Sequence, residues 1–202
     1  MTDNPATNNP ATNNPATEYP ETAATVDELI EVLRSGERVS GEGGGGFSLL
    51  DHGLQCAAVL RTNAPDDQEL QLAGLLHDIG HTLLPGDDAG HGIVAGNFVR
   101  GVLGERVAAL VELHVPAKRY LVTVDSSYQN ELSAVSAQTL LNQGAAMTGD
   151  EVGEFAANVH AASAIALRHA DEQAKVAGLV VDPLESWRPV FEAVSARVTS
   201  AS

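Results

Sequence analysis

Cysteine, basic side chains and long apolar segments are all scarce in this chain of 202 residues. The single cysteine, Cys56, excludes an internal disulfide and suits a reducing compartment. No apolar segment approaches the roughly 20 residues that span a bilayer, and the N-terminus lacks the basic and apolar regions of a signal peptide. We therefore expect a soluble cytoplasmic protein that does not interact with membranes.

The scarcity of basic residues also limits the partners that the chain can bind. Lys and Arg total 11 against 27 Asp and Glu, which gives a formal net charge of -16. Proteins that bind nucleic acids usually carry a basic stripe that neutralises phosphates, and the sequence shows none. We expect no nucleic-acid partner. A small anionic ligand is compatible with this charge, because charges more than about 10 Å apart are largely screened at physiological salt.

The first residues repeat a short polar unit, NPATNNPATNNPAT over residues 4–17. The repeat contains no core-forming side chain, and each of its prolines removes a backbone hydrogen-bond donor. A stacked repeat protein would need longer units with an apolar face. We therefore predict a disordered tail over residues 1–24 and one domain over residues 25–202.

Within this domain, apolar residues recur at helical spacing. Helices are expected over residues 25–35, 47–60, 67–79, 88–103, 106–114, 127–143, 150–177 (with a break near Asn158) and 184–198. A glycine run at 41–46 cannot hold a fixed conformation by itself, and a β-leaning segment at 120–124 is too short to found a sheet. The pattern predicts an all-α fold.

The segment LLHDIGH (75–81) places imidazoles and a carboxylate directly after an apolar run. His77 and His81 share a helix face if the helix continues through Gly80, and Asp78 lies about 100° round the helix from His77. Imidazole together with carboxylate suits iron, zinc or manganese. A helix cap or a surface ion pair explains this motif equally well, so the motif alone does not identify a metal site.

Three further histidines, His52, His91 and His114, fall on separate predicted helices around this motif. Taken singly, each is more often a buried or capping histidine than a ligand. Asp171, within RHADEQAK, can complete the set from a later helix. The ordered series of imidazoles and carboxylates favours one shared metal site.

This series resembles the HD-domain superfamily of helical metalloproteins over roughly residues 49–175. The motifs similar to those of its mixed-valent di-iron oxygenases are DHGLQCA, LLHDIGH, HVPAKRYLV and RHADEQAK. HVPAKRYL is the most specific, because HD phosphohydrolases do not need a lysine at that position. The resemblance implies an enzyme that uses two iron ions, Fe(II)/Fe(III), and dioxygen. It would cleave the C–P bond of a small hydroxyphosphonate such as 2-amino-1-hydroxyethylphosphonate, giving a carboxylate (glycine) and phosphate.

The resemblance also implies a role for each matching residue. One iron would be held by His52, His77, Asp78 and Asp171, and the other by His91, His114 and a bridging Asp78. The implied catalytic residues are His81 and Lys118, and the implied substrate contacts are Glu42, His81, Lys118, Ser136 and Arg168. Four neutral imidazoles and two carboxylates leave about three excess positive charges on the iron pair. A dianionic phosphonate would relieve this excess, and Arg168 and Lys118 carry donors that suit its oxygens.

One part of the family pattern is missing from the chain. The family carries a Tyr-x-Gly-Glu lid before its first histidine, and the corresponding residues here are Val39, Ser40, Gly41 and Glu42. Because valine cannot coordinate iron, we expect an open or water-filled position on the iron bound by His52. We also expect altered recognition of the substrate's amine end.

Two other functions are compatible with the residues alone. A metal-dependent HD phosphohydrolase acting on a small phosphate ester or nucleotide uses many of the same ligands. A non-catalytic metal or ligand sensor would use them without an open coordination position. All three interpretations share an all-α HD-domain bundle with a dinuclear metal site. We expect a monomer or a weak homo-oligomer, and we expect His160 and His169 to be structural or exposed.

Overall fold

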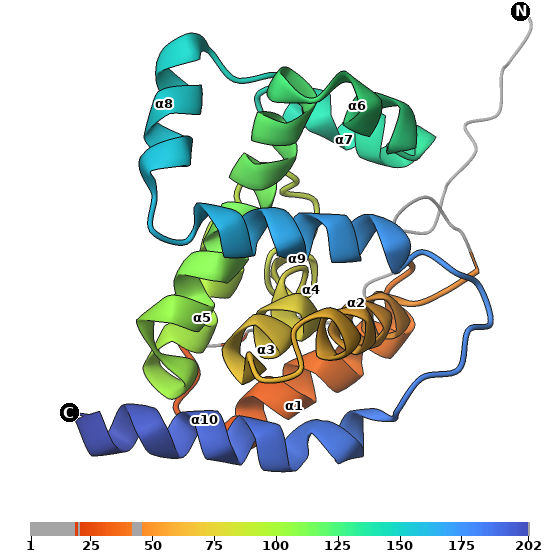
Figure 1. Cartoon of the computed structure of the whole chain (residues 1–202). Coiled ribbons are helices and arrows are strands. Elements are labelled where there is room, and N and C mark those ends of the chain that lie inside the picture. Colours follow the sequence, from red (N-terminus) through yellow and green to blue (C-terminus); the bar gives the residue numbers. More distant parts are fainter. Residues whose placement is uncertain (1–18, 20, 42–45, 202) are drawn as a thin grey trace, which may run out of the picture.

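A computed structural model describes residues 19, 21–41 and 46–201 of the chain, which form helices and loops (Figure 1). The described residues contain no β-strand, only an isolated bridge between Ser40 and Ser48, and this confirms the all-α prediction. The repeat itself lies outside the described residues. Tyr19 and Ala23, which precede the predicted start of the domain, pack against the apolar core.

The helices begin where the sequence supplies capping side chains. Thr25, Ser48, Asp67, Ser133 and Thr148 each accept a hydrogen bond from a backbone N–H in the first turn of the helix that follows. The helices are α1 (Val26–Ser35), α2 (Leu49–Asn63), α3 (Gln68–Leu76), α4 (Gly80–Leu83), α5 (His91–Val124), α6 (Ser126–Glu131), α7 (Ala134–Asn142), α8 (Gly149–Ala157), α9 (Ala161–Gln173) and α10 (Arg188–Ala201). Short 3-10 turns, η1 (Gly36–Arg38) and η3 (Leu184–Trp187), precede α2 and α10.

The prediction for the longest helix was right about its break and wrong about its end. Two helices were expected over residues 88–103 and 106–114, followed by a β-leaning piece at 120–124; α5 starts at His91, breaks at Gly104 and continues as a helix to Val124. Gly104, with a φ of 84°, kinks α5 where the two predicted helices meet. Leu121 and Val122 pack against the apolar side chains near α6, so their burial outweighs the local β preference.

Three other boundaries differ from the prediction. The segment 127–143 divides into α6 and α7, because Ser133 caps a new helix. Helix α3 ends at Leu76, three residues before the expected end, and a separate short helix starts at Gly80. The break near Asn158 is confirmed, although α9 ends at Gln173 and does not reach residue 177.

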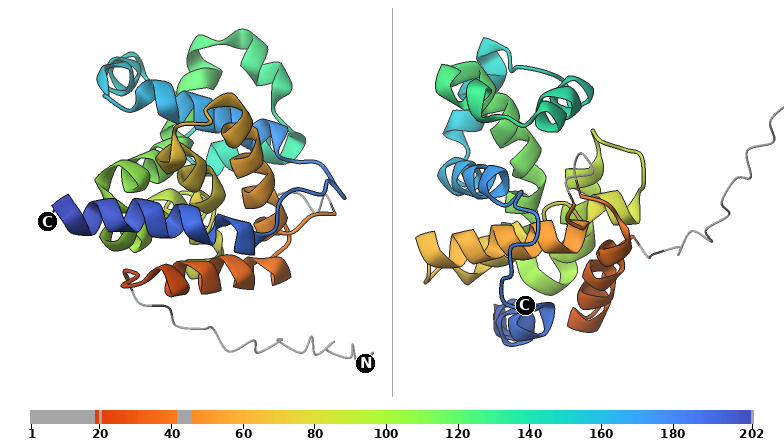
Figure 2. Two further views of the ribbon diagram at one scale, coloured as in Figure 1. Left: turned by 60° about the horizontal axis from the view of Figure 1, so that its bottom comes forward. Right: turned by 90° about the vertical axis from the view of Figure 1, so that its right-hand side faces the viewer.

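Helices α2, α3, α9 and the first half of α5 pack together in the middle of the molecule (Figures 1 and 2). Helices α1 and α10 lie on one side of this layer, and α6, α7 and α8 lie at the far end of α5 (Figure 1). A Cβ atom added at Gly53 of α2 would come 2.5 Å from the carbonyl oxygen of Leu75 in α3. The glycine therefore lets α2 and α3 approach closely, next to His52 and His77.

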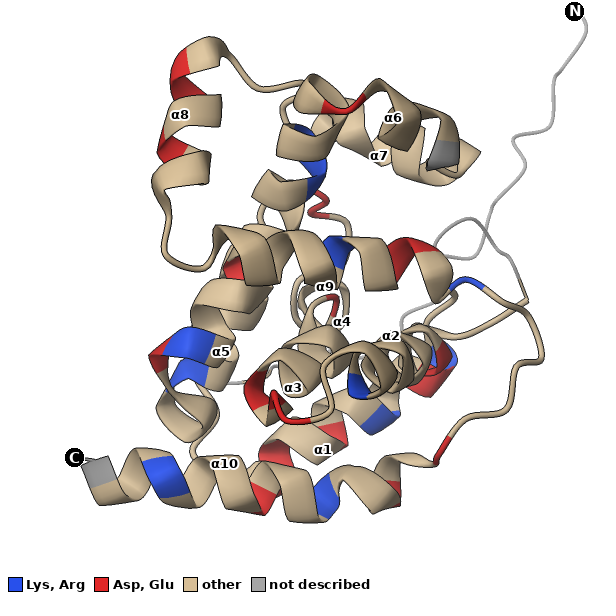
Figure 3. Ribbon diagram, in the orientation of Figure 1, with Lys and Arg blue, Asp and Glu red and all other residues tan. Residues whose placement is uncertain are grey.

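The charged residues are spread over many helices (Figure 3). Several arginines bind carboxylates on other elements, as Arg106 binds Asp67 at 2.7 Å and Arg119 binds Glu151 at 2.7 Å. Among the described residues, no helix combines the length and the apolar character needed to cross a bilayer.

Candidate metal centre

Side chains from four parts of the fold meet in the middle of the helical layer. His52 comes from α2, and His77 and Asp78 follow α3. Helix α5 supplies His91 and His114, and helix α9 supplies Asp171. The structure thus brings together all of the predicted metal ligands, each at most 8% exposed: His52, His77, Asp78, His91, His114 and Asp171.

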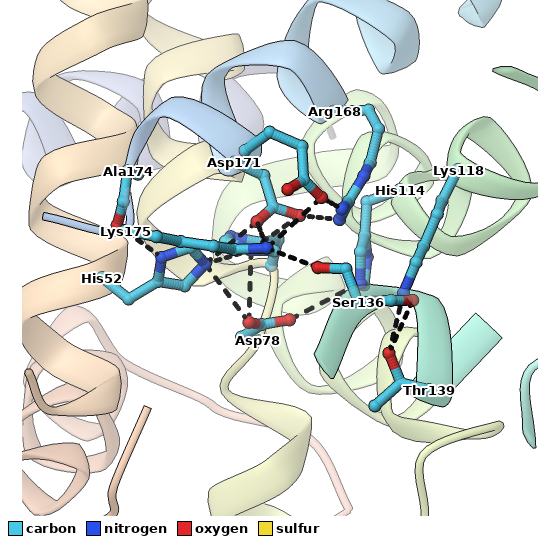
Figure 4. Close-up of polar contacts among 12 residues, drawn as sticks. His52, Asp78, His114, Lys118, Ser136, Thr139, Arg168, Asp171, Ala174 and Lys175 are labelled. Carbon is cyan, nitrogen blue, oxygen red and sulfur yellow. Dashed lines mark hydrogen bonds and ion pairs between the residues drawn. The ribbon is translucent and has the colours of Figure 1, made fainter. Parts of the chain in front are cut away.

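Asp78 lies between two pairs of imidazoles, and Figure 4 shows its carboxylate between His52 of one pair and His114 of the other. Its Oδ2 is 3.5 Å from Nε2 of His52 and 3.3 Å from Nε2 of His77. Its Oδ1 is 3.4 Å from Nε2 of His91 and 3.6 Å from Nε2 of His114. One carboxylate oxygen thus faces each pair, which is the arrangement of a carboxylate that bridges two metal ions.

Asp171 adds a second carboxylate to the first pair only. Its Oδ1 is 3.2 Å from Nε2 of His52, and its Oδ2 is 3.7 Å from Nε2 of His77. The first group of donors therefore consists of His52, His77, Asp78 and Asp171, whereas the second consists of Asp78, His91 and His114. Each group can hold a metal ion.

The hydrogen bonds of the four imidazoles fix which nitrogen faces the centre. Every Nδ1 lies next to a backbone carbonyl oxygen, which can only accept a hydrogen bond, so Nδ1 carries the proton. The distances are 2.9 Å from His52 to Ala174, 2.8 Å from His77 to Gly74, 2.8 Å from His91 to Asp88 and 2.6 Å from His114 to Val111. All four Nε2 atoms therefore direct a lone pair inward.

These lone pairs require a cation between them. The Nε2 atoms of His52 and His77 are 3.2 Å apart, and those of His91 and His114 are 2.8 Å apart. Two lone pairs at such distances repel each other unless a proton or a metal ion lies between them. Imidazole nitrogens and carboxylate oxygens are the donors that iron, zinc and manganese accept, so the residues fit a pair of such ions.

The pKa values of the histidines agree with this need for positive charge. Burial lowers the pKa of His52, but its hydrogen bond with Asp171 and the charge of that carboxylate outweigh burial and raise it. Burial also opposes protonation of His91, and Asp78 raises the pKa of that imidazole. Burial and the neighbouring His91 hold the pKa of His114 well below its ordinary value. At all three histidines the neighbouring carboxylates raise the pKa, against the effect of burial.

Both carboxylates are held in the ionised form that binds metals. Burial raises the pKa of the Asp78 carboxyl, but the imidazoles of His77 and His91 outweigh it and hold the pKa well below the usual range. Burial acts in the same way on Asp171, and Arg168 and other nearby cations hold its pKa well below the usual range. Both aspartates thus present negative oxygens to the centre.

Arg168 lies one helical turn before Asp171 in α9 and is 3% exposed. Its guanidinium binds the carboxylates of Asp171 and Glu172, and its Nε donates to the Tyr128 hydroxyl at 2.6 Å. The ion pair with Asp171 is thus present, and it orients the guanidinium beside the centre rather than at the surface.

The other two predicted anion-binding residues, Lys118 and Ser136, meet at α7: Ser136 belongs to this helix, and Lys118 reaches it from α5 (Figure 4). The ammonium of Lys118, a side chain only 1% exposed, donates to Thr139 Oγ1 at 2.8 Å and to Gln143 Oε1 at 3.0 Å. Ser136, fully buried on α7, accepts a hydrogen bond from Lys175 Nζ at 2.8 Å. Lys118, Ser136 and Arg168 therefore all face the interior on one side of the centre.

His81 sits at the edge of the second group of donors. It lies on α4, and its ring stacks on that of His91 with centroids 4.1 Å apart and an interplanar angle of 17°. His81 and Thr139 also line a cavity of about 360 Å³, together with Val39 and Gly41. Glu42 lies outside the described residues. Val39, which stands where the family has a tyrosine, thus lines the same cavity as His81, the neighbour of His91.

Sequence reasoning missed three residues around the predicted anion site: Tyr128, Glu172 and Lys175. Lys175 lay within a quoted motif, and its place four residues after Asp171 was the available signal. Tyr128 gave no comparable signal, because it reaches Arg168 from a different helix. His160 and His169, which match no ligand of the family, are partly exposed and lie outside both donor groups.

Comparison with known proteins agrees with this geometry. The model of the HD domain matches residues 49–171. A hydroxymethylphosphonate dioxygenase of Gimesia maris is 36% identical over 152 residues, which cover 71% of this chain and 75% of that protein. A 1-hydroxy-2-(trimethylamino)ethylphosphonate dioxygenase (glycine-betaine-forming) of Leisingera caerulea is 31% identical over 153 residues, covering 72% and 78%. The chain belongs to the HD-domain family, in the branch that contains these phosphonate dioxygenases.

Proposed function

We propose that this protein is a di-iron oxygenase that cleaves the C–P bond of a small α-hydroxyphosphonate. The reaction consumes one dioxygen and yields one carboxylate, one phosphate and a proton; 2-amino-1-hydroxyethylphosphonate would give glycine. The observation that carries the proposal is Asp78, which lies between two imidazole pairs next to buried basic residues. The relationship to two phosphonate dioxygenases supports the choice of substrate class.

In this proposal, His52, His77, Asp78 and Asp171 hold one iron, and Asp78, His91 and His114 hold the other. A mixed-valent Fe(II)/Fe(III) pair would supply the Lewis acidity and the electrons for substrate binding and dioxygen activation. The unequal donor sets support different tasks for the two ions. The carbonyl partners of the imidazoles keep every Nε2 directed at the metals.

Lys118 and Arg168 bind the phosphonate in this proposal. The ammonium of Lys118 donates to two neutral acceptors, Thr139 and Gln143. A phosphonate oxygen carries negative charge and is a stronger acceptor for an ammonium than either of them. Arg168 is oriented by Asp171 and Glu172, so one guanidinium connects the anion site to a ligand of the first iron.

His81 acts on the substrate rather than on a metal. Its ring lies nearly parallel to that of His91, so it would adjoin the iron that His91 holds. From this position the imidazole can hold a proton on the substrate's hydroxyl or phosphonate oxygen. The adjoining cavity, with Val39 on its wall, would receive the rest of the substrate. Val39 leaves the first iron without a tyrosine ligand, and Glu42 is proposed to contact the far end of the substrate.

The proposal is tested by coupled measurement of oxygen uptake and phosphate release on iron-loaded protein. Hydroxymethylphosphonate and 2-amino-1-hydroxyethylphosphonate should be compared with p-nitrophenyl phosphate as a substrate for hydrolysis. We expect equal amounts of oxygen consumed and phosphate released from at least one phosphonate. Phosphate release from the ester without oxygen uptake would instead establish the alternative function, a metal-dependent phosphohydrolase.

A further inference from the structure

The chain contains only two lysines, Lys118 and Lys175. Both reach the same short helix, α7, from different parts of the fold. Lys118 comes from α5 and binds Thr139, whereas Lys175 follows α9 and binds Ser136, one turn earlier on α7. In Figure 4 the two side chains reach α7 from different directions, and their partners lie three residues apart on that helix. Lysine in this acidic protein is thus confined to the surroundings of the centre.

Lys175 lies between the first donor group and Ser136. Its Nζ is 2.8 Å from Ser136 Oγ, 3.5 Å from Asp171 Oδ1 and 3.3 Å from Glu172 Oε1. Its side chain is 12% exposed, so solvent screens its charge only weakly. The ammonium therefore stands where a ligand of the first iron and the proposed phosphonate site meet.

We propose that Lys175 is a third basic residue that binds the phosphonate, beside Ser136 and one turn of α7 from the Thr139 partner of Lys118. This inference rests on the proposed function, since it assigns an additional contact to the same substrate. When Asp171 binds a metal ion, the positive metal takes up much of the charge that attracts Lys175. The ammonium then interacts more strongly with an anion placed beside Ser136 than with the carboxylate of Asp171.

Ser136 supports this placement. A hydroxyl that accepts a hydrogen bond from a cation becomes a better donor, so Ser136 can donate to the phosphonate oxygen that Lys175 attracts. The guanidinium of Arg168 already binds the carboxylates of Asp171 and Glu172. Lys118, Lys175 and Arg168 carry three positive charges, and Glu172 offsets one of them. The two that remain match the charge of a dianion, whereas Lys118 and Arg168 without Lys175 would leave only one.

The direct test compares Lys175→Met with Lys175→Arg in iron-loaded protein. The methionine removes the charge but keeps most of the length, whereas the arginine keeps the charge. Arg188→Met is the control. It removes one positive charge from an exposed ion pair between Arg188 on α10 and Asp27 on α1. The quantities measured are the Kd of methylphosphonate by calorimetry, the KM of hydroxymethylphosphonate and the iron content.

We expect Lys175→Met to raise Kd and KM about 10- to 100-fold, the effect of losing one charge-assisted contact. Lys175→Arg should recover most of this loss, Arg188→Met should change neither constant more than about twofold, and all variants should keep their iron. An unchanged Kd in Lys175→Met would overturn the inference. The inference would also be overturned if Lys175→Met lost iron while the protein that kept its iron bound methylphosphonate with the native Kd. Lys175 would then only balance the charge of Asp171.

A second measurement uses the native chain and so does not depend on a variant that folds. Mass spectrometry can follow the acetylation of both lysines with and without saturating methylphosphonate. The anion should slow the acetylation of Lys175 several-fold, and equal rates would contradict the inference. If no phosphonate supports oxygen uptake, the proposed oxygenase fails, but anion binding still decides the role of Lys175.

Discussion

The helical layer that carries the metal ligands and the helix that covers the anion site are built differently. In α3, every residue from Leu70 to Leu76 is buried, whereas Ser136 is the buried residue of α7. Helices α2 and α3 meet at Gly53 with almost no space to spare, but α7 is joined to the domain through hydrogen bonds from Lys118 and Lys175. Close apolar packing thus fixes the ligand-bearing layer, whereas α7 is attached by polar contacts and by a single partly buried leucine, Leu140.

This difference separates two requirements of the site. A metal pair needs donor atoms fixed to within a few tenths of an ångström, and a close-packed core resists displacement of its side chains. A substrate must enter and leave, and hydrogen bonds to Thr139 or Ser136 can be exchanged for bonds to an arriving anion. Substitutions in the ligand-bearing layer should therefore change metal content and stability, and substitutions facing α7 should change KM.

Asp78→Ala should have the largest effect, because one carboxylate serves both donor groups. We expect loss of the mixed-valent EPR signal, loss of at least one iron per chain and no detectable oxygenase activity. Metal analysis and EPR after partial oxidation measure these changes. His160→Ala is the control, since it removes a partly exposed imidazole outside the centre. A normal EPR signal in Asp78→Ala would show that Asp78 is not the bridge.

Gly53→Ala tests the close packing of the ligand-bearing layer. The added Cβ would lie 2.5 Å from the Leu75 carbonyl oxygen, so α2 and α3 must separate. We expect the free energy of unfolding to fall by about 1–3 kcal/mol. Iron content should also fall, because His52 moves away from His77. Urea denaturation measures the first effect and metal analysis the second.

Gly153→Ala is the matched change in α8. An added Cβ there meets no described atom within 4 Å, and alanine is the better helix former. The free energy of unfolding should rise by about 0.5–1 kcal/mol. If Gly53→Ala and Gly153→Ala were equally stable, the close packing inferred for the ligand-bearing layer would be wrong.

Lys118→Ala tests the polar side of the comparison. Losing this charge-assisted contact should raise KM for a phosphonate by a factor equivalent to about 1.5–3 kcal/mol, with iron content unchanged. Arg168→Ala should raise KM too, but it should also reduce iron content, because Arg168 binds the carboxylate of Asp171. Steady-state oxygen uptake and metal analysis distinguish the two. An unaltered KM in Lys118→Ala would remove Lys118 from the anion site.

The smallest effect should come from Asp67→Asn, at the start of α3. The bond from Arg106 lowers the pKa of the Asp67 carboxyl, while asparagine keeps the N-cap function. Because the folded-state pKa is lowered, this carboxylate stabilises the fold above its unfolded pKa and loses the effect as the pH falls through the folded value. Exposure of the pair limits the loss at pH 7 to about 1 kcal/mol or less. Urea denaturation from pH 7 to pH 3 should show the difference between native and variant disappearing in acid; a constant difference would exclude the ion pair.

Much of the centre was predictable because its ligands come at element ends and at helical spacing. The series of histidines around His77-Asp78 favoured one shared metal site, and the resemblance to the HD-domain oxygenases implied which residues form each donor group. The break of α5 at Gly104 was predictable, but its continuation through 120–124 was not, because tertiary packing of Leu121 and Val122 outweighs the local β preference there. Lys175 was missed because its position beside Ser136 depends on where α7 folds, 39 residues earlier in the chain.

The central claim is that two metal ions share Asp78, with a phosphonate bound between the metals and α7. The most direct measurement is anomalous diffraction at the iron edge from crystals of iron-loaded protein containing methylphosphonate. We predict two iron peaks about 3.5–4 Å apart, one on each side of Asp78, with the anion contacting Lys118 and Ser136. A single iron peak, or two peaks without Asp78 between them, would contradict the account, as would methylphosphonate bound away from α7.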